Sequence, residues 1–519
     1  MSEPNLIEPL ENRTLLSAFA AHINFQPKAA PTPAGYVADV GTVFRATKGL
    51  SFGWTAKNPY AVDRNSRRSP DQRYDTFNLL TPGSNGANWE IAVPNGTYQV
   101  HIVAGDPMDQ GNTYRIKAEK TTVIDGKSTA RRHWLEATSI IKVTDGRLTI
   151  AGIKGAVRNK IDFIDIVQTT DPTQNLQAEL ADLASGTAPD ATGTAVTSLD
   201  SGDYLKFSNV LFNAKIESVF ASISVSPDDA GQYIEFHLDS PTGTLLGALK
   251  TQPTGRNGEF VTQHADIDSA PDGVHDLYVV FKGAKPCGSI DWLHFENRPL
   301  TWIMPMGDSI TEAMGGHTSY RRDLYRSLED GGYAIDFVGT RTGVRPGTGD
   351  PAQWDFDLNH EAVFGQRADQ LLSGIDAPLN SEMPDVILLD IGLNDLFAGQ
   401  STDSTAEEIG KIIDKMRAHN PQIKILLALL GPSSKVNDAI VVDLNTKITA
   451  LAQAKTTVEA PIILVDLHTG FDPAKDTYDG THPTPDAEAR QAALWFEALK
   501  PLLPAPPTPP TPPTPQPAP

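Results

Sequence analysis

The sequence predicts a multidomain protein in which two all-β sandwiches precede a three-layer α/β domain built on a parallel sheet. Before residue 300, short segments of alternating apolar and polar residues are separated by turns, which is typical of antiparallel β-structure. After residue 300, near-continuous apolar segments alternate with amphipathic helical patterns. Such segments indicate parallel strands that helices cover on both faces.

Size and composition set the first limits on structure and function. A chain of 519 residues is too long for a single core and favours several domains. The net charge of −21, from 64 acidic and 43 basic residues, argues against nucleic acid or an anionic membrane as a partner. Cys287 is the only cysteine, which excludes an intrachain disulfide and cysteine-based zinc sites. No apolar run approaches the length needed for membrane insertion.

Residues 1–23 are interpreted as a segment that precedes the folded domains. Residues 15–21 form a short apolar patch, but an acidic stretch precedes it, which makes a poor signal peptide. Residues 8–16 resemble a short motif found near the start of many exported bacterial proteins. An export-associated segment and a disordered leader both fit this pattern.

Residues 24–168 are predicted to form the first β-sandwich, of jelly-roll type. The predicted strands include residues 89–93, 98–103, 147–150 and 161–166. The first two are joined by Pro-Asn-Gly-Thr at residues 94–97, which predicts a hairpin. The module loosely resembles malectin-like, galactose-binding-type sandwiches at residues 24–27, 35–36, 52–54 and 94–98.

Residues 172–297 are predicted to form a second β-sandwich. Apolar and polar residues alternate over residues 234–239 and 277–281, as in half-buried strands. The final strand, residues 289–295, is similar in sequence to residues 160–166, which close the first module. The similarity predicts two sandwiches of related plan in tandem.

This second module resembles family six carbohydrate-binding modules over most of its length. The resemblance is carried by residues 177–179, 201–205, 273–281 and 290–292. In that family a calcium ion commonly ties the first and last strands, which implies Glu179 and Asp291 as ligands, and carboxylates suit a hard cation. The aromatic residue that usually precedes residues 201–203 is absent here, so weak sugar binding and a spacer role are both open.

Residues 300–503 are predicted to form the α/β domain. The expected strands are residues 336–339, 385–391, 423–429 and 462–465, in addition to an apolar run that begins at residue 303. The expected helices are residues 320–328, 405–419, 436–452 and 487–499. Residues 504–519 are rich in proline and predict a polyproline tail or linker.

Ser309 lies at the point where the first apolar strand of this domain ends in a Gly-Asp-Ser turn. Ligands of open α/β sheets bind beyond the carboxyl ends of the strands, so this position makes Ser309 a candidate nucleophile. A serine in such a turn more often caps the following helix, and the turn alone does not decide between the two roles.

Three further segments supply the other groups that acyl transfer requires. His482 can take the proton of Ser309 through one ring nitrogen, while Asp479 holds the other ring nitrogen. The backbone amides of Ser309 and Gly365 and the side-chain amide of Asn394 can form the oxyanion hole. Each residue alone has an ordinary structural explanation, but their joint order at predicted strand ends favours a catalytic site.

Together these segments resemble the SGNH (GDSL) hydrolase superfamily over nearly all of residues 300–503. The likeness is closest to carbohydrate esterase family three, the acetyl xylan esterases, through residues 303–311, 320–322, 336–339, 360–361 and 384–389. The resemblance implies a flavodoxin-like fold and assigns the superfamily's four named residues to Ser309, Gly365, Asn394 and His482. Leu393 replaces the usual threonine, and residues 362–366 replace a more polar run.

These resemblances imply a bacterial carbohydrate esterase, secreted or at the cell surface, that removes O-acetyl groups from a xylan-like polysaccharide. The chemistry needs no cofactor, and the sandwiches would hold the enzyme on the polymer. The alternatives are a lipid esterase or thioesterase of the same superfamily and a non-catalytic carbohydrate-binding surface protein. A metallohydrolase using Asp308, His360 and His482 is a further alternative. The oligomeric state is left open.

Overall fold

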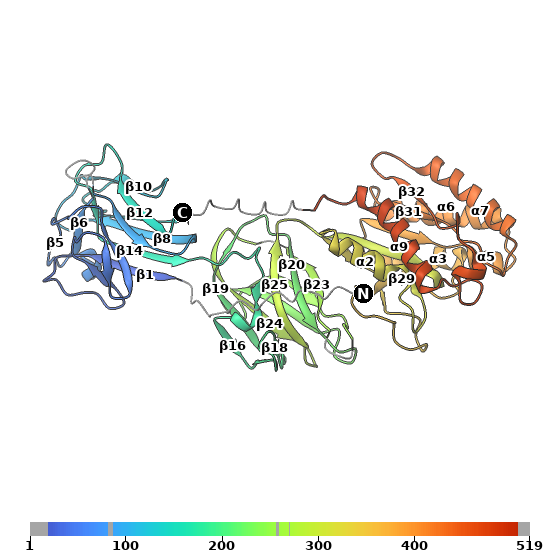
Figure 1. Cartoon of the computed structure of the whole chain (residues 1–519). Coiled ribbons are helices and arrows are strands. Elements are labelled where there is room, and N and C mark those ends of the chain that lie inside the picture. Colours follow the sequence, from blue (N-terminus) through green and yellow to red (C-terminus); the bar gives the residue numbers. More distant parts are fainter. Residues whose placement is uncertain (1–18, 81–86, 256–258, 269, 507–519) are drawn as a thin grey trace, which may run out of the picture. The chain divides into compact units, whose positions relative to one another are not determined.

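The computed structural model describes residues 19–80, 87–255, 259–268 and 270–506 (Figure 1). The predictions for residues 1–18 and 507–519, including the export-associated motif, lie outside this range. Residues 20–23, which were predicted to precede the folded domains, belong instead to the first strand, β1 (Ala20–Phe25), because Ala21 and Ile23 pack in the core of the first sandwich. The chain divides into two compact units. One comprises Met1–Pro172 with Phe207–Asn213 and Pro271–Leu277, and the other comprises Thr173–Lys206, Ala214–Ala270 and Tyr278–Pro519.

The first unit contains the predicted sandwich. One sheet has the order β11-β8-β14-β1-β2, and the facing sheet has the order β10-β9-β12-β7-β4-β3. The first sheet consists of β1 (Ala20–Phe25), β2 (Val37–Asp39), β8 (Gly96–Gly105), β11 (Trp134–Val143) and β14 (Phe163–Gln168). The second consists of β3 (Arg45–Thr47), β4 (Leu50–Trp54), β7 (Trp89–Ala92), β9 (Thr113–Ala118), β10 (Thr121–Lys127) and β12 (Arg147–Gly152). A small third sheet joins β5 (Val62–Asp63), β6 (Thr76–Leu79) and β13 (Lys160–Ile161).

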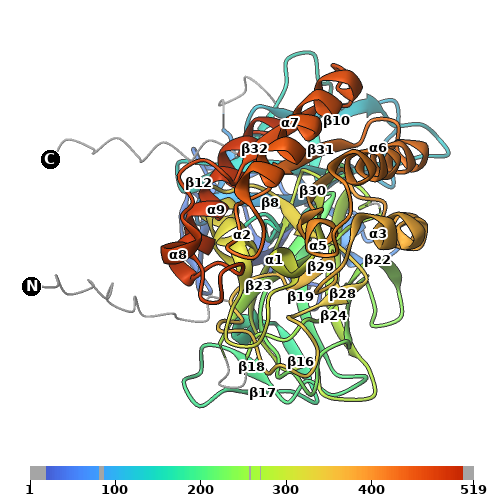
Figure 2. The same ribbon diagram turned by 90° about the vertical axis from the view of Figure 1, so that its right-hand side faces the viewer.

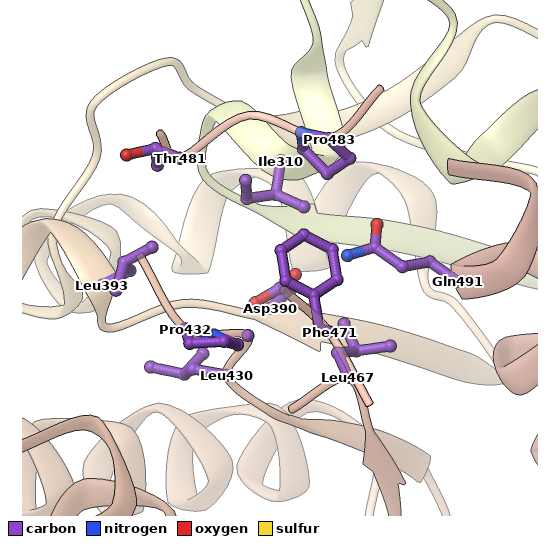
Figure 3. Close-up of a pocket in the computed structure, with 11 residues that line it drawn as sticks. Ile310, Asp390, Leu393, Leu430, Pro432, Leu467, Phe471, Thr481, Pro483 and Gln491 are labelled. Carbon is purple, nitrogen blue, oxygen red and sulfur yellow. The ribbon is translucent and has the colours of Figure 1, made fainter. Parts of the chain in front are cut away.

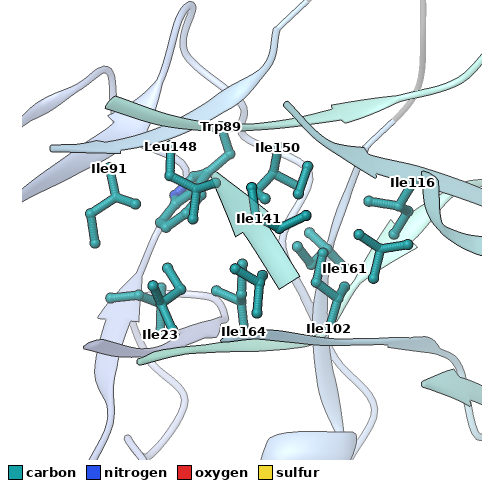
Figure 4. Close-up of a cluster of buried hydrophobic side chains, with 14 of the residues drawn as sticks. Ile23, Trp89, Ile91, Ile102, Ile116, Ile141, Leu148, Ile150, Ile161 and Ile164 are labelled. Atoms are coloured by element: carbon teal, nitrogen blue, oxygen red, sulfur yellow. The ribbon is translucent and has the colours of Figure 1, made fainter. Parts of the chain in front are cut away.

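Alternating burial along the strands forms the core between these sheets. In β9, Tyr114, Ile116 and Ala118 are buried while the residues between them are partly exposed. Figure 4 shows the resulting layer, in which isoleucines from both sheets meet around the buried Trp89. The all-β prediction for this part of the chain is therefore confirmed. The hairpin predicted at residues 94–97 is wrong, because β7 and β8 lie in different sheets and the turn connects one sheet to the other.

A carboxylate that the sequence did not single out organises one end of this core. Asp39 is 1% exposed and accepts hydrogen bonds from the indole nitrogens of Trp54 (2.8 Å) and Trp89 (3.0 Å). The backbone amide of Gly41 donates a third bond at 2.8 Å. Burial raises the pKa of Asp39, and these three donors oppose that rise.

The second sandwich contains the remaining β-strands that precede the α/β domain. Its first strands are β15 (Leu176–Gln177), β16 (Leu183–Ser185), β17 (Ala188–Pro189), β18 (Val196–Thr197), β19 (Tyr204–Phe212) and β20 (Ser218–Ser224). They are followed by β21 (Tyr233–Leu238), β22 (Thr244–Lys250), β23 (Val261–Asp266), β24 (Gly273–Lys282) and β25 (Ser289–Glu296). In one sheet, β17, β18, β25, β20 and β23 are neighbours in that order. β25 also pairs with β15, so the first strand of the module lies beside its last.

The α/β domain is built on a sheet whose main strands are all parallel. The strands are β26 (Thr301–Gly307), β27 (Ile335–Phe337), β28 (Arg341–Thr342), β29 (Asn359–Ala362), β30 (Val386–Asp390), β31 (Lys424–Leu429) and β32 (Ile462–Asp466). β27 pairs with β26, and β26-β30-β31-β32 continue the sheet. Numbered along the chain, these strands have the order 2-1-3-4-5, which is the flavodoxin-like order. This confirms the predicted fold class.

Helices cover both faces of this sheet, and β30 shows why. Its Ile387 and Leu389 pack with α3, α6 and α7, whereas Val386 and Leu388 pack with α2 and α9. Figure 2 shows α2 and α9 on one side of the strands and α3 and α6 on the other. The helices are α1 (Ser309–Glu312), α2 (Ser319–Asp330), α3 (Ala368–Gly374), α4 (Asp376–Glu382), α5 (Leu393–Phe397), α6 (Thr402–His419), α7 (Asp438–Lys455), α8 (Pro473–Asp476) and α9 (Pro485–Leu499).

Helix caps explain where the predicted helix boundaries were wrong. The Ser401 side chain accepts a hydrogen bond from the Ser404 amide, so α6 begins before the predicted residue 405. Pro485 occupies the first turn of α9, where its missing N–H costs nothing. Within the part of the chain that the structure describes, no helix combines the length and apolar character required to cross a membrane.

We expect Asp39→Ala to lower the free energy of unfolding of the first sandwich by about 3–5 kcal/mol. The reason is that the indole N–H groups of Trp54 and Trp89 would remain buried without an acceptor. Urea unfolding followed by tryptophan fluorescence measures the loss. The control is Asp145→Ala, which removes an exposed turn carboxylate from the same sandwich and should cost less than about 1 kcal/mol. Equal losses in the two variants would contradict this account.

Candidate active site

Ser309 lies at the carboxyl end of β26, as the sequence predicts. Gly307, the last residue of the strand, has φ +152°, and a Cβ there would lie 2.0 Å from the backbone oxygen of Asp390 on the neighbouring β30. Only glycine fits this close approach. Asp308 then caps α1 by accepting a hydrogen bond from the Ile310 amide at 3.0 Å. The turn leaves Ser309 only 5% exposed, as the first residue of the short helix α1.

His482 approaches Ser309 from the loop that precedes α9. Its Nε2 lies 2.9 Å from Ser309 Oγ, and its Nδ1 lies 2.8 Å from Asp479 Oδ2. The other oxygen of Asp479 accepts hydrogen bonds from the backbone amides of Thr481 (3.0 Å) and His482 (2.9 Å). The loop is therefore closed on one carboxylate, which fixes the direction of the imidazole.

The environment of Asp479 keeps it ionised. Partial burial by itself raises the pKa of this carboxyl group. Hydrogen bonds from the His482 backbone and imidazole outweigh that effect and hold the pKa well below its usual range. Lys435 Nζ also lies 3.5 Å from Asp479 Oδ2, a contact that the sequence did not suggest. An ionised Asp479 favours the tautomer in which His482 Nε2 is free to accept a proton.

A small cavity of about 160 Å³ lies in front of Ser309 and His482. Phe364, Asn394 and Phe397 are among the residues that line it. These side chains are therefore placed to contact an ester that binds in front of Ser309.

Two of the predicted oxyanion donors are placed differently with respect to this cavity. Asn394 lines it, and its Nδ2 donates one hydrogen bond to Asp308 Oδ2 at 2.8 Å, which leaves the second N–H of the amide for a ligand. Gly365 does not line the cavity, although its neighbour Phe364 does. Gly365 has φ +79°, and among the described residues its amide has no hydrogen-bond acceptor.

Two aromatic rings stack on the imidazole, and the sequence did not suggest them. Phe364 stacks on His482 with ring centroids 5.0 Å apart, and Tyr478 stacks on it at 5.8 Å. The guanidinium of Arg345 lies 4.1 Å from the centroid of Phe364. These contacts restrict the imidazole to one plane in addition to the restraint from Asp479.

A buried arginine is hydrogen-bonded to the backbone of α1. Arg321, part of the segment that carried the family resemblance, is fully buried and donates to four backbone oxygens, those of Thr311, Glu312, Gly343 and Leu358. Burial lowers the pKa of this guanidinium to about 10. The side chain connects α1 to the loop after β28 and to the loop before β29, and so holds the position of Ser309 indirectly.

The metallohydrolase alternative finds no support in this geometry. Asp308, His360 and His482 do not form a group of metal-ligand spacing among the described residues. His360 is 1% exposed, and its Nδ1 accepts a hydrogen bond from the Ala362 amide at 3.1 Å. It therefore has a structural role within β29.

Of the predicted calcium ligands in the second sandwich, Asp291 lies on β25, and Glu179 lies in the short 3-10 helix Ala178–Leu180 that follows β15. Gln177 on β15 pairs with Trp292 on β25. Glu179 follows Gln177 by two residues, and Asp291 directly precedes Trp292. Neither carboxylate belongs to a cluster of three metal-ligating groups within the described part of the chain. The two residues supply the oxygen donors that calcium prefers, and backbone carbonyls or water would have to complete the shell.

Comparisons with known proteins agree with the two domain types. Residues 306–490 match the model of the GDSL-like Lipase/Acylhydrolase family, and residues 177–297 match that of Carbohydrate binding module (family 6). A multidomain esterase from Ruminococcus flavefaciens is 28% identical over 228 residues, which is 38% of this chain and 28% of the relative. An endo-1,4-beta-xylanase A from Thermoclostridium stercorarium is 26% identical over 301 residues, covering 48% of this chain and 43% of the relative.

A solved structure shows a similar match. The family 3 carbohydrate esterase of Clostridium thermocellum is 30% identical, with a TM-score of 0.35, and the match covers 39% of this chain and 96% of that one. The chain spans less than half the length of either curated relative. It contains a GDSL-like lipase/acylhydrolase domain preceded by a family 6 carbohydrate-binding module.

Proposed function

We propose that this chain is a serine esterase that removes O-acetyl groups from a polysaccharide such as xylan. The observation that carries the proposal is the continuous hydrogen-bond chain from Asp479 through His482 to Ser309, which ends at the small cavity. This is the arrangement that activates a serine hydroxyl for acyl transfer.

In the proposed reaction, Ser309 Oγ attacks the ester carbonyl while His482 Nε2 takes its proton. The amides of Ser309 and Gly365 and the side chain of Asn394 stabilise the oxyanion. His482 then returns the proton to the departing sugar hydroxyl, which leaves an acetyl group on Ser309. A water molecule, activated by the same imidazole, releases acetate and restores the serine. These steps require no cofactor.

The preference for a short acyl group rests on the walls of the cavity. Leu393, Phe364 and Phe397 surround the space beside Ser309 with apolar surface. A volume of about 160 Å³ with apolar walls beside Ser309 suits a short acyl group such as acetyl. This favours the carbohydrate esterase over the lipid esterase of the same superfamily.

The polysaccharide part of the proposal rests on the second sandwich and on the relatives. A family 6 carbohydrate-binding module on the same chain would raise the local concentration of polymer at the active site. Both curated relatives are named for activities that suit this setting, an esterase and a xylanase. We also propose that the protein works outside the bacterial cell, because its polymeric substrate does not enter cells.

Ser309→Ala is expected to lower kcat/KM for acetate release from acetylated xylan by about 10³-fold or more, because it removes the nucleophile. Released acetate is measured directly, with acetylated pectin and mannan in parallel to rank the polymers. Ser373→Ala, an exposed serine of α3, is the matched control and should keep wild-type activity. Full activity in Ser309→Ala would refute the proposed mechanism.

The cavity walls predict a preference among synthetic esters. We expect kcat/KM for 4-nitrophenyl acetate to exceed that for the butyrate ester by about tenfold or more, because two added methylenes meet apolar walls that leave little room. Phe397→Ala removes a partly exposed wall and should raise the butyrate-to-acetate ratio several-fold. A wild-type enzyme that prefers octanoate would favour the lipid esterase instead.

We further propose that calcium binds Glu179 and Asp291 and stabilises the second sandwich. Scanning calorimetry with calcium in excess should then show a higher Tm than with EDTA, since a ligand at about 100 times its Kd adds about 2.7 kcal/mol. Glu179→Ala should abolish the difference, whereas Asp190→Ala, which removes a loop carboxylate of the same module, should preserve it. Identical Tm values in calcium and EDTA would argue against the site.

A further inference from the structure

A second, smaller pocket lies behind the catalytic turn (Figure 3). Ile310, Leu393 and Thr481 line both this pocket and the cavity in front of Ser309. It measures about 20 Å³, enough for one water molecule. Apart from Thr481, the polar side chains that line it are Asp390 and Gln491.

Asp390 is unusual because it is buried without a partner. It is the last residue of β30 and is 4% exposed, yet its carboxyl group has no hydrogen bond or ion pair to any residue that the structure describes. Gln491 on α9 is 5% exposed, and its Oε1 is also buried without a partner. Both side chains face the same water-sized space (Figure 3). Two hydrogen-bond acceptors that face the same small pocket require a hydrogen atom between them.

A second buried carboxylate lies next to Asp390. Gly307 is paired with Asp390 across the sheet, and the Asp308 amide donates to the Asp390 backbone oxygen at 3.3 Å. Asp308 is 2% exposed, and burial together with the charge of Asp390 raises its pKa. Burial raises the pKa of Asp390 to about 7. Two such groups in a low-dielectric site do not both ionise near neutral pH.

Hydrogen bonding decides which of the two holds the proton. Asp308 accepts bonds from the Ile310 amide (3.0 Å) and from Asn394 Nδ2 (2.8 Å), and both bonds favour its charged form. Asp390 accepts none. The proton of the pair therefore belongs on Asp390, from which it can reach Gln491 Oε1 through one water molecule.

We propose that Asp390 is a positioning residue of the active site: by holding the proton of the pair, it keeps Asp308 ionised and bonded to the Asn394 amide. This inference rests on the proposed function, in which Asn394 stabilises the oxyanion. When Asp390 loses its proton, a second negative charge forms beside Asp308 and displaces its carboxylate. The Asn394 amide then loses its anchor, and transition-state stabilisation falls.

The other groups around Asp390 do not supply this titration. The phenol of Tyr320 on α2 faces the pair, but burial raises its pKa far above the range concerned. Asp395 on α5 acts on Asp308 by charge, and burial raises the pKa of Asp395 to about 6, although both of its oxygens accept from the Ala368 amide at 3.1 Å. Asp395 therefore loses its proton at a lower pH than Asp390. The remaining described walls of the pocket, from the segments after β31 and β32 and the loop before α9, carry no titratable side chain.

The test is the pH profile of kcat/KM for 4-nitrophenyl acetate. In the wild-type enzyme, activity should fall on the alkaline side as Asp390 ionises near neutral pH. Asp390→Asn is neutral at every pH and should move this fall upward by about one pH unit or more. An unchanged alkaline fall in Asp390→Asn would overturn the proposal.

Asp357→Asn is the matched control. Asp357 is also buried, burial raises its pKa to about 8, and its oxygens accept from the backbone amides of Phe337 (3.1 Å) and Asn359 (2.9 Å). It lines neither the pocket behind Ser309 nor the cavity in front of it. The alkaline fall should stay in place in this variant. An equal shift in Asp357→Asn would also overturn the proposal, because a change in buried charge anywhere in the domain would then suffice.

A second measurement does not depend on esterase activity. The folded protein holds the Asp390 proton to a higher pH than the unfolded chain does. Its contribution to stability is therefore present below the unfolded pKa of about 4 and is lost as the pH rises to about 7. In a Ser309→Ala background, Asp390→Asn should raise Tm by roughly 2–4 °C at pH 8 and less at pH 5. Equal changes at both pH values would refute the shared proton even if the proposed function failed.

Discussion

The hydrogen bond between His482 and Ser309 joins two segments that lie 173 residues apart in the chain. It forms because β26 ends at Gly307 and the loop before α9 is closed on the carboxylate of Asp479. The parallel sheet fixes one segment, and the Asp479 turn fixes the other, so the chemistry depends on the order of the strands as much as on the two side chains.

The part of this site that depends on strand ends could be predicted from the sequence. Ser309, Asn394 and the Asp479–His482 pair follow or precede apolar segments, and the structure brings them to one edge of the sheet. Their catalytic roles remain predictions. The placement of Gly365 is less direct, because its loop presents Phe364 to the cavity. The tandem sandwiches and the helix-covered parallel sheet also followed from alternation and apolar runs, whereas the flavodoxin-like strand order was implied by the resemblance to the superfamily.

The contacts that the sequence did not suggest are those between side chains on different loops. Phe364 and Tyr478 stack on the imidazole of His482, and the guanidinium of Arg345 lies over the Phe364 ring. No periodic sequence pattern links these three residues. Asp390 was predicted only as part of an apolar strand. Its lack of a partner depends on what α9 and the neighbouring strands place around it. Likewise, the role of Asp39 depends on two tryptophans from other strands.

A common physical theme connects these features. Two charged groups beside the catalytic turn, Arg321 and Asp308, are removed from water and held by backbone groups or by the Asn394 amide, whereas Asp390 beside them keeps its proton. Polar groups fixed in this way need little reorganisation when charge develops on the substrate. Burying these groups lowers the free energy of unfolding, because charges lose their hydration. The buried groups lie at the site where function requires a fixed geometry.

The most direct test of the account is to find where the acyl group resides during turnover. Rapid acid quenching of the enzyme with excess 4-nitrophenyl acetate, followed by peptide mass spectrometry, detects a covalent intermediate. The account predicts the added mass of one acetyl group on the peptide that contains Ser309. An acetyl group on any other residue, formed at the rate of turnover, would contradict it.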